Sequence, residues 1–143
     1  MRNEALLRKL RDDIARVGTP ARANSAALPF GVATIDNALP RQGLELASLH
    51  EIAGGASGAL HGAAAILFAA GIAARTRGQI LWCMTRPDLF APALAQAGLD
   101  PDRIIIVEAG DEASLLACCE EGLRHGGLGT VVGEIAKLSM TAS

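Results

Sequence analysis

The stretch Glu51-Ile-Ala-Gly-Gly-Ala-Ser-Gly-Ala-Leu-His-Gly62 decides the fold of this chain. It leads from an apolar segment with the character of a strand, residues 46–53, through glycines into a long apolar helix pattern at residues 59–75. A strand, a glycine-containing turn and a helix in this order are typical of a phosphate-binding P-loop, in which backbone amides approach the phosphates. The stretch therefore predicts the shape of a nucleotide-binding loop.

The side chains that give a P-loop its chemistry are missing from this stretch. The motif G-x-x-x-x-G-K-[S/T] places a lysine on the phosphates and a hydroxyl on Mg²⁺. Counted from Gly54, these two positions hold Leu60 and His61; counted from Gly55, they hold His61 and Gly62. We therefore predict a protein that is not an enzyme and has no resident cofactor or metal. The predicted degenerate P-loop consists of Gly54, Gly55, Ser57, Gly58, Leu60 and His61.

Two interpretations of this loop remain open. Free amides at the start of helix 59–75, with the Ser57 hydroxyl, can attract a phosphate through the helix dipole. Alternatively, the glycines only allow a tight turn from strand to helix, which is the interpretation we favour. Hydrolysis of a nucleotide also needs one carboxylate to position the attacking water and another to bind the metal ion. Glu134, after strand 129–133, is the acid nearest such a position, and we interpret it as a relic or a surface group.

Bulk composition restricts the class of protein. The chain has 143 residues, half of them hydrophobic and 3% aromatic, with a net charge of -2. This charge argues against binding of nucleic acid or anionic lipid by the whole surface. Three cysteines and the lack of a signal sequence predict a cytoplasmic protein with reduced thiols. The apolar run 59–74 is shorter than the roughly 20 residues of a membrane span, so we predict a buried core helix.

The chain is predicted to consist of an arm, residues 1–27, and a core, residues 28–143. The arm contains an amphipathic helix at residues 3–17 and a linker from Ala21 to Ala27. Whether the helix binds a partner or folds back on the core stays open. The apolar stripe of the helix is formed by Leu6, Leu10, Ile14 and Val17.

Strands and helices alternate along the core, which predicts a parallel sheet covered by helices on both faces. Predicted strands are 46–53, 79–84, 103–108 and 129–133; predicted helices are 59–75, 88–97 and 112–124, after a short helix capped near Thr34. Asp88 and Asp111 are predicted helix starts, and Gly98 and the pair 126–127 are predicted stops. The sequence ends at Ser143, soon after the last strand, which predicts C-terminal truncation and an unpaired strand edge.

No other cluster in the sequence predicts catalytic or metal chemistry. Cys118 and Cys119 are neighbours on a helix and point in different directions, so they cannot chelate one ion as a C-x-x-C pair does. We interpret them, with Cys83, as small buried hydrophobes. Ser48 and His50 share a face of the predicted strand, but with Glu51 they lie too close along the chain to form a catalytic triad.

Several short segments of the sequence resemble segments of known proteins. The run from Phe30-Gly31 to Gly54 resembles the entry to the RecA ATPase core. More specific phrases are similar to the ImuA family of RecA-like, SulA-related damage-inducible proteins. These phrases are Leu28-Pro-Phe-Gly31, Leu49-His-Glu-Ile52, Ile80-Leu-Trp-Cys83, Asp88-Leu-Phe-Ala-Pro92 and Val131-Val-Gly-Glu134.

The resemblance implies a RecA-like fold. It also implies an accessory role in SOS-induced mutagenesis, translesion DNA synthesis and DNA repair. The implied partners are an ImuB-like, polymerase-related protein and RecA. The ATPase residues of RecA are not carried over, because this chain lacks the P-loop lysine, the hydroxyl residue after it and the catalytic glutamate. Two alternatives stay open: a SulA-like cell-division inhibitor that binds FtsZ, and a weak nucleotide-binding protein or ATPase that borrows its lysine from a neighbouring protomer.

Overall fold

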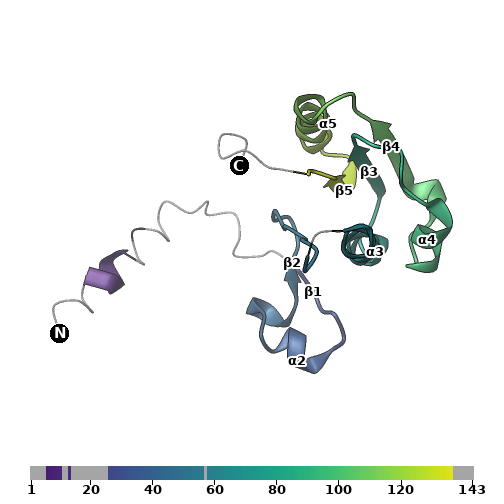
Figure 1. The fold of residues 1–143 in the computed structure, drawn as a ribbon. Coiled ribbons are helices and arrows are strands. Elements are labelled where there is room, and N and C mark those ends of the chain that lie inside the picture. The colour runs from purple at the N-terminus through teal and green to yellow at the C-terminus, as the bar shows by residue number, and fades with distance from the viewer. Residues whose placement is uncertain (1–5, 11–12, 14–25, 57, 137–143) are drawn as a thin grey trace. The chain divides into compact units, whose positions relative to one another are not determined.

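A computed structural model of the protein describes residues 6–10, 13, 26–56 and 58–136 (Figure 1). The chain forms two compact units, the first ending at His50 and the second beginning at Glu51. Residues 6–10 and 13 are helical, and the rest of the predicted helix 3–17 lies outside the described residues, as does most of the predicted linker. The division into an arm and a core at residue 27 therefore stays a prediction.

Residues 26–50 of the first unit form a small antiparallel ribbon and two short helices. These elements are β1 (Ala27–Leu28), α2 (Ala33–Asp36), the 3₁₀ helix η2 (Pro40–Gln42) and β2 (Leu44–Glu45). The Asp36 carboxylate accepts hydrogen bonds from the backbone amides of Phe30 and Gly31, at 2.7 and 2.9 Å, and so closes the loop before α2. The predicted cap near Thr34 is wrong, because the residue before α2 is Val32, which makes no side-chain cap.

The second unit is a parallel three-stranded sheet with helices on both faces, as predicted (Figure 1). Its elements are α3 (Ala59–Ala74), β3 (Gln79–Met84), α4 (Ala91–Gln96), the 3₁₀ helix η3 (Pro101–Arg103), β4 (Ile104–Glu108), α5 (Glu112–His125) and β5 (Leu128–Gly133). The strand order is β4-β3-β5, so β3 is central. Within the described residues, no helix combines the length and the apolar character needed to cross a bilayer.

The central strand β3 separates two hydrophobic clusters. Because side chains alternate along a strand, Ile80 and Trp82 face one cluster, whereas Leu81 and Cys83 face the other. The first cluster joins β3 to α3 through Ala70 and Ala73, to α4 through Leu94, and to the turn after α4 through Leu99. The second joins β3 to α5 through Leu115 and the half-buried Cys118 and Cys119. The continuous apolar sequence of β3 is explained by burial on both faces.

The arginine at the end of η3 fixes the C-terminal end of α3. The Arg103 guanidinium donates hydrogen bonds to the carbonyl oxygens of Ala74, Thr76 and Gly78, at distances from 2.7 to 3.1 Å. These carbonyls lie where α3 ends and the chain turns toward β3, and helix ends leave such groups without helical partners. Arg103 therefore links the helix that starts at the glycine turn to the start of β4.

Two sequence predictions about elements are wrong. Residues 46–53 form no strand in the structure, and the ribbon strand β2 ends at Glu45. Ala47 has a φ of 56°, a left-handed conformation that interrupts an extended run. Helix α4 begins at Ala91 rather than at Asp88. Pro92 lies in the first turn of α4, the position in a helix where proline is accepted.

The other helix boundaries agree with the predictions. The Asp111 carboxylate accepts a hydrogen bond from the backbone amide of Ser114 at 2.7 Å and caps α5. Gly126 ends α5 in the left-handed conformation, with a φ of 69°. Gly98 follows α4 with a φ of 91°.

Candidate functional site

The glycine turn before α3 is held by a close contact between backbone segments. A Cβ atom on Gly54 would lie 2.9 Å from both the Cβ atom and the carbonyl oxygen of His61. Gly58, the residue before α3, has a φ of 125°, which favours glycine, and it provides no side-chain cap. Its carbonyl accepts the first helical hydrogen bond, from the Gly62 amide at 3.1 Å. The backbone geometry of the turn thus explains why glycine occupies positions 54 and 58, without any role in phosphate binding.

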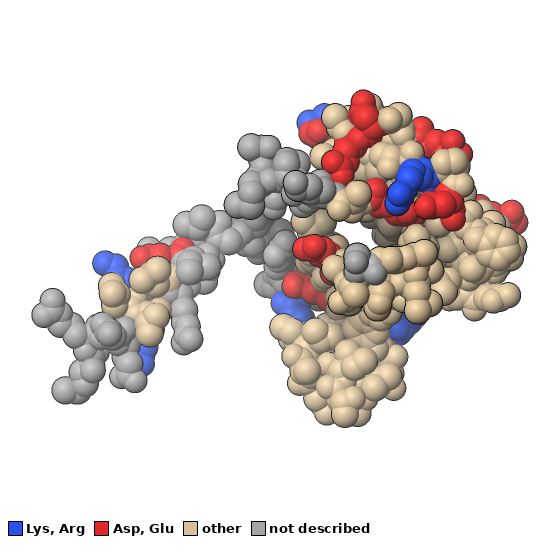
Figure 2. All heavy atoms as spheres, viewed as in Figure 1, with Lys and Arg blue, Asp and Glu red and all other residues tan. Residues whose placement is uncertain are grey.

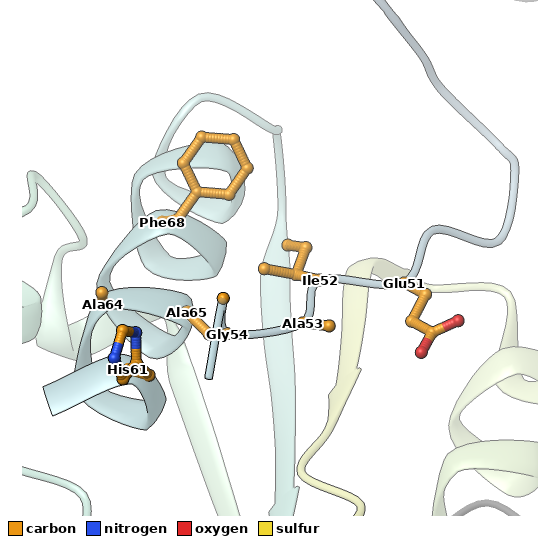
Figure 3. A pocket seen from close by; sticks show the side chains of 9 residues that line it. Glu51, Ile52, Ala53, Gly54, His61, Ala64, Ala65 and Phe68 are labelled. Atoms are coloured by element: carbon orange, nitrogen blue, oxygen red, sulfur yellow. The ribbon is translucent and has the colours of Figure 1, made fainter. Parts of the chain in front are cut away.

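A shallow pocket of about 380 Å³ lies between this turn and α3 (Figure 3). Figure 3 shows the Ile52 side chain directed toward the helix, with Phe68 on one side and the Gly54 turn on the other. Glu51 lies at the far end of the same segment, and His61 lies on the first turn of α3. The lining residues are Glu51, Ile52, Ala53, Gly54, Gly55, His61, Ala64, Ala65 and Phe68.

The structure brings together only part of the predicted degenerate P-loop. Gly54, Gly55 and His61 line the pocket. Leu60 is 79% exposed and is not a lining residue. Ser57 lies outside the described residues. The role of these residues toward a nucleotide remains a prediction.

The half-buried Glu134 lies beyond β5 and contacts the central strand. Its carboxylate accepts a hydrogen bond from the indole Nε1 of Trp82 at 2.6 Å, and its backbone amide donates to the Cys83 carbonyl. Burial raises the pKa of Glu134 above its ordinary value, and the nearby charge of Asp88 adds to this effect. The Trp82 bond and the charge of Arg86 act in the opposite direction. Glu134 is therefore a structural partner of Trp82 as well as an acid at the edge of the sheet.

Sequence reasoning did not find this contact, because the two residues lie 52 positions apart. The available signal was a lone tryptophan in an apolar strand, since a buried indole N–H needs an acceptor. Reasoning from sequence also did not find the pocket wall formed by Ala64, Ala65 and Phe68. The available signal there was that helix 59–74 is apolar around its whole circumference.

The cysteines are free thiols packed between β3 and α5. Burial raises the pKa of Cys83 to about 12, with a further contribution from Cys119. Burial also raises the pKa of Cys119. A thiol with such a pKa is a poor nucleophile at neutral pH, because the thiolate is the reactive form. Among the residues that the structure describes, no group of three or more His, Cys, Asp or Glu side chains is placed to hold a metal ion.

Comparison with known proteins relates the chain to ImuA and SulA. No protein-family model matches the chain. The chain is 35% identical over 125 residues to Protein ImuA of Caulobacter vibrioides, in strains NA1000 / CB15N and ATCC 19089 / CIP 103742 / CB 15. The match covers 85% of this chain and 51% of the relatives, so the chain spans about half of their length. Among solved structures, SulA from Pseudomonas aeruginosa matches with a TM-score of 0.50 and 30% identity, covering 61% of this chain and 76% of that chain.

The fold and the turn define the second unit as an α/β domain with a parallel sheet between helices and a glycine turn without the P-loop lysine. Over the residues aligned, the chain is a homologue of ImuA and belongs to the family related to ImuA and SulA. The family resemblance of the sequence phrases is thereby confirmed. The names of these relatives state no enzymatic activity.

Proposed function

We propose that this chain is a non-catalytic accessory protein of the DNA-damage response that acts by binding other proteins. The observation that carries the proposal is the 35% identity to ImuA over 85% of the chain. The proposed setting is SOS-induced mutagenesis, translesion synthesis and DNA repair in the cytoplasm. The proposed partners are an ImuB-like, polymerase-related protein and RecA.

The chemistry of the glycine turn supports a non-catalytic role. The lysine and hydroxyl positions hold Leu60 and His61, or His61 and Gly62. Without a lysine on the phosphates and a hydroxyl on Mg²⁺, a P-loop loses its main charge contacts with a nucleoside triphosphate. The contact between Gly54 and His61 gives the remaining turn a structural role.

Purified proteins test the proposed partners directly. We expect the immobilised chain to retain an ImuB-like protein or RecA in a reversible, concentration-dependent manner. A calorimetric titration then gives the affinity. If the chain binds neither the ImuB-like protein nor RecA, the proposal is contradicted.

A second candidate function is inhibition of cell division through FtsZ. The structural match to SulA, at 30% identity, favours it. Purified FtsZ, added under the same conditions as the other two proteins, distinguishes the candidates. Retention of FtsZ alone would favour the SulA-like function.

A titration with ATP and Mg²⁺ tests the non-catalytic part of the proposal. We expect no turnover by the protein as it is. We also expect none in the double variant Leu60→Lys with His61→Thr, because it restores two P-loop side chains but not the catalytic glutamate that positions the attacking water in the RecA pattern. Micromolar affinity with measurable turnover in the unmodified protein would contradict the proposal.

A further inference from the structure

We propose that the outer side of α3 and the adjoining pocket bind a protein segment that inserts one apolar side chain and places a lysine or arginine against Glu51. This inference rests on the proposed function, because it assigns a surface and a partner chemistry to the protein-binding role. We call the surface formed by Leu60, Phe68 and the pocket residues the α3 docking surface.

Helix α3 is apolar on two opposite sides, and the sheet covers only one of them. Ala70 and Ala73 are fully buried and pack in the cluster that contains Ile80 and Trp82. Residues 59–74 contain no Asp, Glu, Lys or Arg, so no charged side chain solvates the other side. A helix that is apolar around its whole circumference is normally buried all round. The sequence of α3 therefore fits a second contact.

The outer side of α3 carries large apolar side chains in a helical stripe. Leu60 is 79% exposed and Phe68 is 49% exposed. Residues 60, 64 and 68 are spaced by four and so lie along one side of the helix. Ala64 lies between the two large residues and lines the pocket together with Phe68, whereas Leu60 lies on the same stripe beyond the pocket. A depression bordered by large apolar groups is the typical seat of an anchoring side chain in protein interfaces.

The lining of the pocket determines the chemistry of the anchor. Ile52, Ala64, Ala65 and Phe68 provide apolar walls. A volume of about 380 Å³ lies near the lower end of the range of small-molecule sites, roughly 300 to 1,000 Å³, and accommodates a side chain such as Leu, Met or Phe.

A carboxylate at the edge of the pocket selects the residue beside the anchor, and Figure 3 shows this Glu51 side chain directed away from α3. Glu51 is the acidic member of the lining, and the described lining residues include neither Lys nor Arg. A partner segment with Lys or Arg next to its anchor therefore complements the site, whereas an acidic segment or a phosphate group meets a carboxylate without a neutralising cation. Figure 2 shows tan spheres over α3 and acidic side chains gathered over α5, so the α3 docking surface is a distinct surface of the second unit.

Peptides test this chemistry without knowledge of the natural partner. The probes are short peptides with one Leu, Met or Phe anchor, flanked either by lysines or by glutamates, and binding to the full chain is followed by fluorescence anisotropy. We expect lysine-flanked peptides to bind at least about tenfold more tightly than the matched glutamate-flanked peptides. Absence of binding by every lysine-flanked peptide, or equal binding of both sets, would overturn the inference.

Variants assign the binding to the surface. We expect Phe68→Gln and Leu60→Gln each to weaken the binding of lysine-flanked peptides by about tenfold or more. Glu51→Gln should remove the preference for lysine over glutamate and retain binding of the anchor. Leu123→Gln is the matched control, since Leu123 is 70% exposed on α5 and lies outside the pocket. Equal loss in the control and in Leu60→Gln would contradict the assignment, and circular dichroism establishes that each variant is folded.

Two further measurements separate this inference from the proposed function and from a membrane role. If an ImuB-like protein or RecA binds the unmodified chain and the Phe68→Gln variant equally, the proposed function stands and the α3 docking surface is wrong. If lysine-flanked peptides bind as expected but neither protein does, the surface stands and the proposed function is wrong. Sedimentation of the unmodified chain, but not of Phe68→Gln, with phosphatidylcholine vesicles would show a lipid-binding surface and overturn the inference.

Discussion

Helices α3 and α5 both pack on the central strand β3, but their outer sides differ. The outer side of α5 carries charged groups, with Glu120 and Arg124 paired at 2.7 Å, and Asp111 and Gly126 cap its ends. The outer side of α3 carries Leu60 and Phe68, and the residue before α3 is an uncapped glycine. The composition of α5 suits a helix that packs on the sheet with one side and faces solvent with the other. The composition of α3 suits a helix that is covered on both sides. The same fold thus contains one helix adapted to water and one adapted to a partner.

The largest expected effect concerns how closely α5 packs on the sheet. A Cβ atom on Gly122 would lie 2.4 Å from Leu81 Cδ2. We expect Gly122→Val to lower the free energy of unfolding by about 1 to 3 kcal/mol, because it overpacks this contact. Urea denaturation measures the change.

The control for this substitution lies on α3. Among the residues that the structure describes, no atom outside the helix backbone and the adjacent residues lies within 4 Å of a Cβ atom built on Gly62. Gly62→Ala should therefore leave stability unchanged or raise it by up to about 1 kcal/mol, the gain in helix propensity. Equal destabilisation by both substitutions would remove the difference between a tightly packed α5 and an open first turn of α3.

A second expected effect concerns Trp82 and Glu134, which pair on the sheet face covered by α3. Because the folded-state pKa of Glu134 lies above the ordinary 4.5, the folded protein binds more protons than the unfolded protein between the two values. The contribution of Glu134 to stability is therefore present below this interval and is lost as the pH rises through it. The slope is at most about 1.4 kcal/mol per pH unit, the limit for one proton.

Urea denaturation as a function of pH, followed through the fluorescence of the single tryptophan, measures this effect. We expect Glu134→Gln to lose this part of the pH dependence. An unchanged pH profile in the variant would show that Glu134 is solvated and that the contact with Trp82 does not persist.

The smallest expected effect concerns the cap of α5. The hydrogen bond from the Ser114 amide lowers the pKa of Asp111 below 3.8. Its stabilising contribution is therefore present above that value and is lost as the pH falls through the lowered pKa. We expect Asp111→Ala to lower the thermal midpoint slightly at neutral pH, with the difference disappearing in acid.

The substitution Asp111→Asn distinguishes the cap from the charge. Asparagine also caps helices but does not titrate in this range, so this variant should retain its stability at low pH. A constant difference between Asp111→Ala and the unmodified protein from neutral to acid pH would contradict the assigned hydrogen bond.

The parts of the fold that the sequence predicts well are governed by local signals. Strand β3 was predicted with its observed bounds, because burial on both faces gives a continuous apolar run. The start of α5 was predicted from Asp111, and its end from Gly126. The start of α4 was missed because Asp88 was interpreted as a cap, although Pro92 marks the first turn.

The parts that the sequence does not predict depend on contacts between distant residues. Residues 46–53 are apolar enough for a strand, but a strand also needs a neighbour in the sheet, and the left-handed Ala47 interrupts the run. The glycine pattern correctly indicated a turn at Gly54, yet the pocket depends on Ile52 and on the side of α3 that faces it. Which side of an all-apolar helix is buried cannot be read from its own sequence.

Hydrogen–deuterium exchange, measured with and without a bound protein partner, tests the central claim most directly, because it reports protection along the whole chain without mutation. The account predicts new protection in residues 51–56 and in the first turns of α3, with exchange in α5 unchanged. Protection confined to α5 or to the edge strand β4, with none at the glycine turn and α3, would contradict it.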